Sequence, residues 1–237
     1  REVEALVTER EARWERLALR VEADPAWICA EGAEGIDAIG AGAIGGFRDE
    51  RIGVLRRVLN RLVVGESVGA GAIAELVEEL VDIAGRMGDA EWFGAMAVGT
   101  RRKIDSIAEH CFSVGALSAG VAVQMGWSRE DARAAAYAGL LADSGLALIS
   151  APVRALGRAL TDIEINAVHR HPRLSAGLVE RVRACSPEAG IPESVGLAVA
   201  QHHEREDGSG YPRGLRAGAI HEIAKVVGAA PFTTWCA

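Results

Sequence analysis

The sequence lacks several features that would assign it to a specialised class of protein. No stretch reaches 18 consecutive apolar residues, and the nearest approach, residues 114–125, is broken by serine and glycine. A membrane-spanning helix is therefore not expected. Basic residues are interleaved with acidic ones and the formal net charge is −7. A surface for a nucleic-acid polymer, which needs clustered lysine and arginine, is not expected either.

The cysteines are few and far apart. Cys29, Cys111, Cys185 and Cys236 show no Cys-x-x-Cys spacing. A zinc ribbon or a disulfide framework needs closer spacing, so neither is predicted. The pattern favours reduced thiols in a cytoplasmic protein.

Alternation with a period of two, which is typical of half-buried strands, is also nearly absent. Apolar residues recur instead at helical spacing, first at Ile52, Leu55, Val58, Leu59 and Leu62 and then at Ile73, Leu76, Val77, Leu80 and Val81. A further helix is predicted over residues 101–126, with His110 on its apolar face. The chain is therefore predicted to be all-α.

Capping and proline signals predict the boundaries of the later helices. Ser128 is suited to cap one helix, and Thr161 with Glu164 has the spacing of a capping box. Pro172 predicts an interruption of the helix that begins at the capping box. Pro192 predicts the first turn of a further helix.

The N-terminal residues predict a charged helix. Within residues 1–23, positions spaced by four and three residues form a seam made of Val3, Val7, Arg10, Trp14, Leu17 and Val21. Two partners stay open for this seam: a second copy of the chain, giving a homodimer through residues 3–21, or another helix of the same chain.

A glycine-rich segment follows over residues 32–46. The stretch Gly40–Gly45 matches the spacing G-x-G-x-x-G, but the residues before it make a poor strand and no βαβ alternation follows. A flexible connector is therefore favoured over a dinucleotide site. We divide the chain into residues 1–46, a charged helix with this connector, residues 47–100, a helical region, and residues 101–237, which carry the motifs below.

The most informative stretch is His-His-Glu-Arg-Glu-Asp-Gly-Ser-Gly-Tyr-Pro-Arg-Gly-Leu, residues 202–215. Adjacent histidines with an acid suit a metal site, and the glycines and proline suit a shaped loop beside it for a phosphate-bearing ligand. Imidazole and carboxylate ligands fit Fe, Mn, Zn or Ni. The candidate metal ligands are His110, Asp143, His171, His202 and His203.

These segments resemble the HD-GYP family, bacterial metal-dependent phosphodiesterases that cleave cyclic di-GMP. The resemblance covers roughly residues 95–230: His110 matches a helical histidine, Asp143 the aspartate of a His-Asp pair, and His171 the histidine of a His-Pro pair. It implies an all-α, HD-domain-like helical bundle, here with additional N-terminal helices. It further implies a cytoplasmic domain that works with a signalling protein, and ligand contacts at Gly210, Tyr211, Pro212 and Arg213.

Three positions depart from the family pattern. Ala142 stands where the histidine of the His-Asp pair belongs, Leu146 where a lysine belongs, and Pro231 where a last aspartate belongs. The resemblance implies two metals bridged by Asp143. The half-site completed by His171, His202 and His203 is intact here, whereas the half-site that includes His110 is not. The chain is therefore predicted to bind one transition metal ion or none.

Three functions stay open. We favour a degenerate domain, weak or inactive in cyclic di-GMP hydrolysis, that binds a cyclic dinucleotide or a signalling protein, because one metal cannot supply the charge stabilisation of two. The alternative is an active metal-dependent phosphohydrolase that uses the remaining half-site, with Asp143 in catalysis. The third is a structural helical partner without a ligand.

Overall fold

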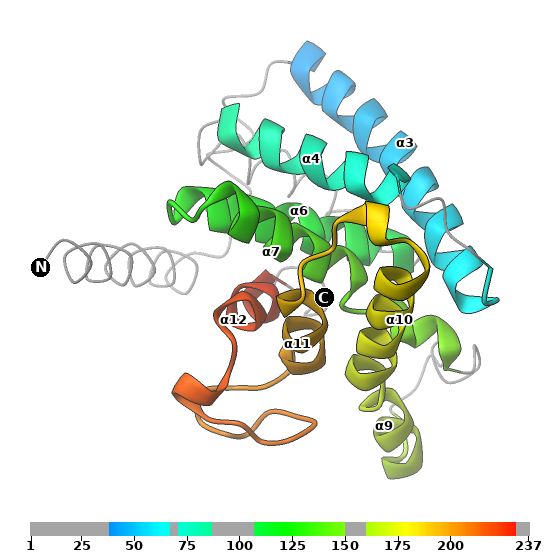
Figure 1. Ribbon diagram of the computed structural model, residues 1–237, viewed down its shortest axis with the longest axis vertical. Coiled ribbons are helices and arrows are strands. Elements are labelled where there is room, and N and C mark those ends of the chain that lie inside the picture. The colour runs from blue at the N-terminus through cyan, green and yellow to red at the C-terminus, as the bar shows by residue number, and fades with distance from the viewer. Residues whose placement is uncertain (1–37, 67–70, 87–106, 150–159, 231–237) are drawn as a thin grey trace, which may run out of the picture.

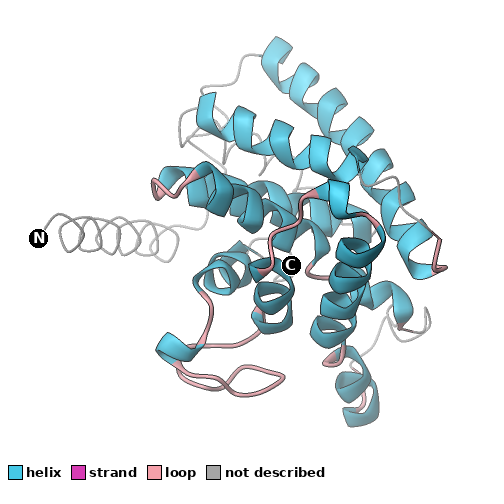
Figure 2. Ribbon diagram, in the orientation of Figure 1, coloured by secondary structure: helices cyan, strands magenta, loops and turns pink. Residues whose placement is uncertain are grey.

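The computed structural model describes residues 38–66, 71–86, 107–149 and 160–230, and within these ranges it contains helices and no strand (Figure 2). The prediction of an all-α protein is confirmed. The α-helices are α3 (Ala38–Val63), α4 (Gly71–Arg86), α6 (Ile107–Gln124), α7 (Arg129–Leu141), α9 (Asp162–Val168), α10 (His171–Cys185), α11 (Ser194–Gln201) and α12 (Glu222–Ala229). Short 3₁₀ turns are η1 (Ser144–Leu148), η2 (Pro187–Ala189) and η3 (Ala217–Ala219). The seam of residues 3–21, Cys29, Pro231 and Cys236 lie outside the described residues.

Helix α6 forms the centre of the bundle. It contacts α3 and α4 on one side and α7 and α12 on the other (Figure 1). Residues 108–122 are consequently buried all round the helix except at Glu109. The prediction of a single apolar face was too narrow, because a helix surrounded by other helices has no face left for water. None of the described helices is long and apolar enough to cross a membrane.

Helices α6 and α7 approach each other most closely at a pair of glycines. A Cβ atom added to Gly139 would lie 2.6 Å from the Cα atom of Gly115, and a Cβ atom added to Gly115 would clash with the side chain of Leu140. The two backbones are therefore in direct contact. Because α7 ends just before Asp143, this contact also sets where that carboxylate enters the core.

The helices before residue 87 agree with the predicted apolar stripes but not with the predicted connector. All ten residues of the two stripes are buried. Residues 38–46, expected to be part of a flexible connector, are instead the first turns of α3. Several alanines and the absence of proline let the helix propagate from the stripe toward the N-terminus, although each glycine disfavours it by about 1 kcal/mol. Gly40–Gly45 thus lie in a helix rather than in a phosphate-binding turn, and the boundary predicted after residue 46 falls inside α3.

The predicted caps and the predicted helix interruption near Pro172 are confirmed, whereas the prediction for Pro192 needs correction. Ser128 caps α7, and Thr161 with Glu164 forms a complete capping box at the start of α9. The helix that begins at the capping box is interrupted at residues 169–170, two residues before Pro172, and Pro172 itself lies in the first turn of α10, where its missing N–H costs nothing. Pro192 precedes α11, which begins at residue 194.

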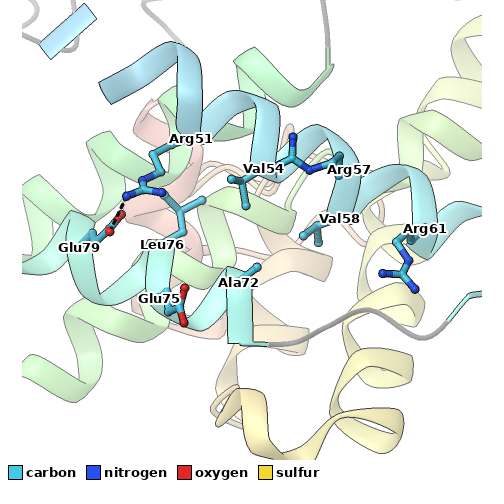
Figure 3. A pocket seen from close by; sticks show the side chains of 9 residues that line it. All are labelled: Arg51, Val54, Arg57, Val58, Arg61, Ala72, Glu75, Leu76 and Glu79. Atoms are coloured by element: carbon cyan, nitrogen blue, oxygen red, sulfur yellow. Dashed lines mark hydrogen bonds and ion pairs between the residues drawn. The ribbon is translucent and has the colours of Figure 1, made fainter. Parts of the chain in front are cut away.

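A cavity of about 330 Å³ opens between α3 and α4. Its floor is apolar, with Val54, Val58 and Leu76, and an ion pair between Arg51 and Glu79 (2.8 Å) closes one end (Figure 3). None of the described residues that line it is a histidine, an aspartate or a cysteine. The chemistry that the motifs predict must therefore lie elsewhere in the molecule.

We predict that Gly139→Ala destabilises the protein by about 1–3 kcal/mol, because the added methyl group forces α6 and α7 apart. Gly177→Ala is the matched control, since a Cβ atom at Gly177, also within a helix, meets nothing within 4 Å. The free energy of unfolding of that variant should rise by about 0.5–1 kcal/mol, because alanine has a higher helix propensity than glycine. Urea unfolding measures the free energy of unfolding of both variants. An equal change in the two variants would show that the contact between Gly115 and Gly139 is not tight.

Candidate metal centre

Asp143 occupies the junction between α7 and η1. Its backbone has φ −101° and ψ 7°, the sparsely populated bridge region between helix and strand conformations where active-site residues often lie. The side chain is buried. The next turn is fixed against α10, because the N–H of Gly145 donates a hydrogen bond to Ser175 Oγ at 2.8 Å. The carboxylate is thus held at a defined point in the core.

Two buried histidines face this carboxylate from helix ends. His171 begins α10 and donates its Nδ1 hydrogen to the carbonyl of Val168 at 2.8 Å. His202 follows α11 and donates its Nδ1 hydrogen to the carbonyl of Val199 at 2.7 Å. A carbonyl oxygen can only accept, so both rings carry their proton on Nδ1 when neutral. Their Nε2 atoms are left as ligand atoms, an orientation typical of metal-binding histidines.

The Nε2 atoms of His171 and His202 lie only 3.3 Å apart. They lie 3.1 Å and 3.8 Å from Asp143 Oδ1, respectively. Two lone pairs and a negatively charged oxygen therefore point into the same small volume. Such an arrangement is electrostatically unfavourable unless a proton or a cation lies among them, so the donor set itself calls for positive charge.

His203 completes the set. Its ring centroid lies 4.1 Å from that of His202 and 4.9 Å from that of His171. One ligand atom from each of Asp143, His171, His202 and His203 lies within 4.8 Å of the others. Burial and repulsion from His202 lower the pKa of His203 to about 2, so its imidazole is neutral and able to bind a metal.

His110 is placed differently from the other predicted ligands. Its Nε2 atom lies 3.0 Å from Asp143 Oδ2, the oxygen that does not face the other histidines. Burial would raise the pKa of Asp143, but the neighbouring imidazoles of His110, His171 and His202 outweigh it and hold that pKa well below its usual range. The structure therefore brings all five predicted ligands together, with His110 on the far side of the carboxylate.

The positions that depart from the family pattern offer no ligand atom. Ala142 is fully buried at the end of α7, and Leu146 is buried in η1. Cys111, next to His110, is a free buried cysteine. Burial and the nearby charge of Asp143 raise its pKa well above the usual range, so it stays a thiol. Cys185 is free and exposed, which agrees for these two residues with the predicted absence of disulfides.

The loop after His203 is closed by the side chain of Glu204. This buried carboxylate accepts the N–H of Arg213 at 2.7 Å and the N–H of Leu215 at 2.8 Å, one on each oxygen. Backbone N–H groups that converge on one carboxylate hold a loop strongly, because charge-assisted hydrogen bonds are the stronger kind. The loop is thereby tied to the residue that follows the last histidine ligand.

The predicted ligand-binding residues lie in this loop. Gly210 packs against the backbone of residues 203–205, and Tyr211 stacks on the ring of His203 with 4.6 Å between centroids. Pro212 and Arg213 are exposed. Sequence reasoning missed His169, whose ring stacks on Tyr211 at 3.9 Å. The available signal was its position in His-Arg-His-Pro, two residues before a ligand.

A family model described as "HD domain" matches residues 94–232, more than half of the chain, and the chain belongs to the HD domain family. Within it, the relatives support membership of the HD-GYP group. The cyclic di-GMP phosphodiesterase response regulator RpfG of Xanthomonas campestris is 37% identical over 110 residues, 46% of this chain and 28% of that protein. The cyclic di-GMP phosphodiesterase PA4108 of Pseudomonas aeruginosa is 34% identical over 117 residues, 49% of this chain and 27% of that protein. The matched part thus spans little more than a quarter of each relative.

The low pKa of His203 predicts how the stability of the metal-free protein depends on pH. An unfolded histidine, with a pKa of about 6.5, gains a proton below that pH, whereas folded His203 stays neutral down to about pH 2. The free energy of unfolding should therefore fall as the pH drops below 6.5, with up to about 1.4 kcal/mol per pH unit from this residue. The depressed pKa of Asp143 acts only below about pH 4, where unfolded carboxyls protonate.

Urea unfolding between pH 7 and pH 4.5, in the presence of a chelator, tests this prediction. His203→Gln removes the titrating ring and should flatten the dependence. Identical slopes for the two proteins would contradict a neutral His203 in the fold.

Proposed function

We propose that the chain is a degenerate HD-GYP domain that binds one transition metal ion and hydrolyses cyclic di-GMP weakly or not at all, acting as a binding or interaction module. The observation that carries the proposal is the asymmetry of Asp143. Its Oδ1 atom faces the Nε2 atoms of His171 and His202. Its Oδ2 atom lies next to His110 Nε2, and Ala142 and Leu146, which the family pattern would replace with histidine and lysine, offer no ligand atom.

The donor set on the Oδ1 side fits a single metal ion. Three imidazoles and one carboxylate suit Fe, Mn, Zn or Ni, and metal binding needs the imidazoles in their neutral form and the carboxylate ionised. A bound ion there would acidify a water molecule and polarise a phosphate oxygen. The ligands would be Asp143, His171, His202 and His203.

The Oδ2 side does not support a second ion. Of the ligands that the family implies on this side, His110 and Asp143 remain. Ala142, in place of a histidine, carries only a methyl group. Leu146 places an aliphatic side chain where a lysine would neutralise a phosphate oxygen. The loss of one such stabilising group typically lowers a rate about 10²–10³-fold, so several losses together leave little hydrolysis.

A cyclic dinucleotide is the ligand class that the relatives favour, since both are named as cyclic di-GMP phosphodiesterases. Residues Gly210–Arg213 are the proposed contacts. Glu204 presents the loop in a fixed shape, and Arg213 is exposed, with a guanidinium group suited to a phosphate. The loop can thus serve recognition even where hydrolysis is impaired.

The second candidate is a phosphohydrolase that works with the single ion. The observation in its favour is the completeness of the four-residue set, because a mononuclear centre with an open position can still hydrolyse phosphoesters. Asp143 would then hold the ion at the reaction centre.

Hydrolysis of cyclic di-GMP by the metal-replete chain tests the main proposal. The reconstituted variant Ala142→His/Leu146→Lys/Pro231→Asp should hydrolyse it at least about 100-fold faster than the unmodified chain, as expected for restored charge stabilisation. Calorimetric titration with cyclic di-GMP should show binding to the unmodified chain that weakens in Arg213→Glu. Rapid hydrolysis by the unmodified chain would contradict degeneracy.

The second candidate has its own test, with a generic phosphodiester such as bis-(p-nitrophenyl) phosphate. Activity that disappears in His203→Ala but persists in His221→Asn would support it. His221 is a matched control because it is a histidine outside the cluster, where it caps α12, and asparagine is a good replacement cap. Activity retained in His203→Ala would exclude this centre as its source.

A further inference from the structure

The third histidine ligand is oriented differently from the other two. The rings of His171 and His202 are each fixed by a hydrogen bond from Nδ1 to a backbone carbonyl. Within the described residues, His203 has no comparable hydrogen bond from its ring, and its contacts are aromatic. Tyr211 lies nearly parallel to it, with 4.6 Å between centroids and 21° between planes.

Tyr211 is itself held from its other side. His169 stacks on it with 3.9 Å between centroids and 15° between planes. Two rings cannot occupy the same face of Tyr211 at such distances, so His169, Tyr211 and His203 form a three-layer stack with the tyrosine in the middle. The N–H of Tyr211 also donates to the carbonyl of His203 at 3.1 Å, which fixes the middle layer along the backbone.

The outer layer of this stack comes from the end of a peripheral helix. His169 is the C-terminal cap of α9, and the preceding residue, Val168, supplies the carbonyl that orients His171. Helix α9 has no buried residue of its own. Its last turn therefore contacts the site through two residues, each of which acts on a different histidine ligand.

We propose that His169 is a positioning residue of the metal centre. Its ring presses Tyr211 flat against His203, so that the third imidazole keeps the orientation in which its nitrogen points at the cluster. The role needs the flat shape of the ring and not its nitrogen atoms. This inference rests on the proposed metal centre, because orientation of His203 matters when that ring binds an ion.

The test compares His169→Ala with His169→Phe in the full chain. Loss of groups that orient metal ligands typically weakens metal binding about 10–100-fold, so the alanine variant should bind Zn²⁺ at least about 10-fold more weakly in competition with a chelator. The phenylalanine variant keeps the flat ring and should restore affinity to within a few-fold. His221→Asn, outside the stack, should bind as the unmodified chain does.

A second readout uses the metal-free protein and separates this inference from the proposed function. In NMR spectra, the ring protons of His203, assigned with His203→Gln, should be shifted upfield by the stacked tyrosine. His169→Ala should move them toward unstacked values and His169→Phe should restore them.

The positioning role is overturned if alanine changes neither readout, or if phenylalanine behaves like alanine, since the nitrogen atoms would then be what matters. An unmodified chain that binds no Zn²⁺ would overturn the proposed metal centre instead. The NMR comparison would then still decide whether His169 holds the stack.

Discussion

The buried carboxylate of Asp143 is the constraint on which the rest of the site depends. A charged oxygen in the core of a helical bundle is unfavourable unless several partners compensate it. The two carboxylate oxygens have different partners: His110 lies next to Oδ2, whereas His171 and His202 face Oδ1. Removing any of these partners would leave charge uncompensated in the interior. The same arrangement makes the cluster a candidate for an ion, since a cation compensates the carboxylate and the facing lone pairs together.

The bundle supplies this arrangement mainly from the ends of helices. Asp143 follows α7, His171 begins α10, and His202 follows α11. At such ends the backbone carbonyls and N–H groups lack partners within the helix, so they are available to orient side chains. The carbonyls of Val168 and Val199 do so for two ligands. The glycine contact between α6 and α7 sets the position of His110 relative to Asp143, so the site also depends on packing between residues that carry no ligand atom.

Much of the fold and the residues that form the buried cluster could be predicted from the sequence. The apolar stripes were predicted correctly because their residues recur at helical spacing, and the residues of the buried cluster were identified because His202 and His203 adjoin a glycine-rich loop. Spacing alone could not predict which oxygen of Asp143 each histidine faces, since that depends on how α6, α10 and α11 are arranged around η1. His169 was missed because Pro172 predicted a break at the proline, whereas the break lies at residues 169–170. With the break placed before His171, His169 caps a separate helix whose end meets Tyr211.

The central claim is that one half of a two-metal site remains. Elemental analysis of the metal-replete chain, after removal of loosely bound ions, tests it most directly. We expect one transition metal ion per chain, lost in His203→Ala. Two ions per chain would contradict it, because His110 and Asp143 would then be holding a second ion without the missing ligands. No ion at all would contradict it equally, since the facing imidazoles would then be compensated by protons alone.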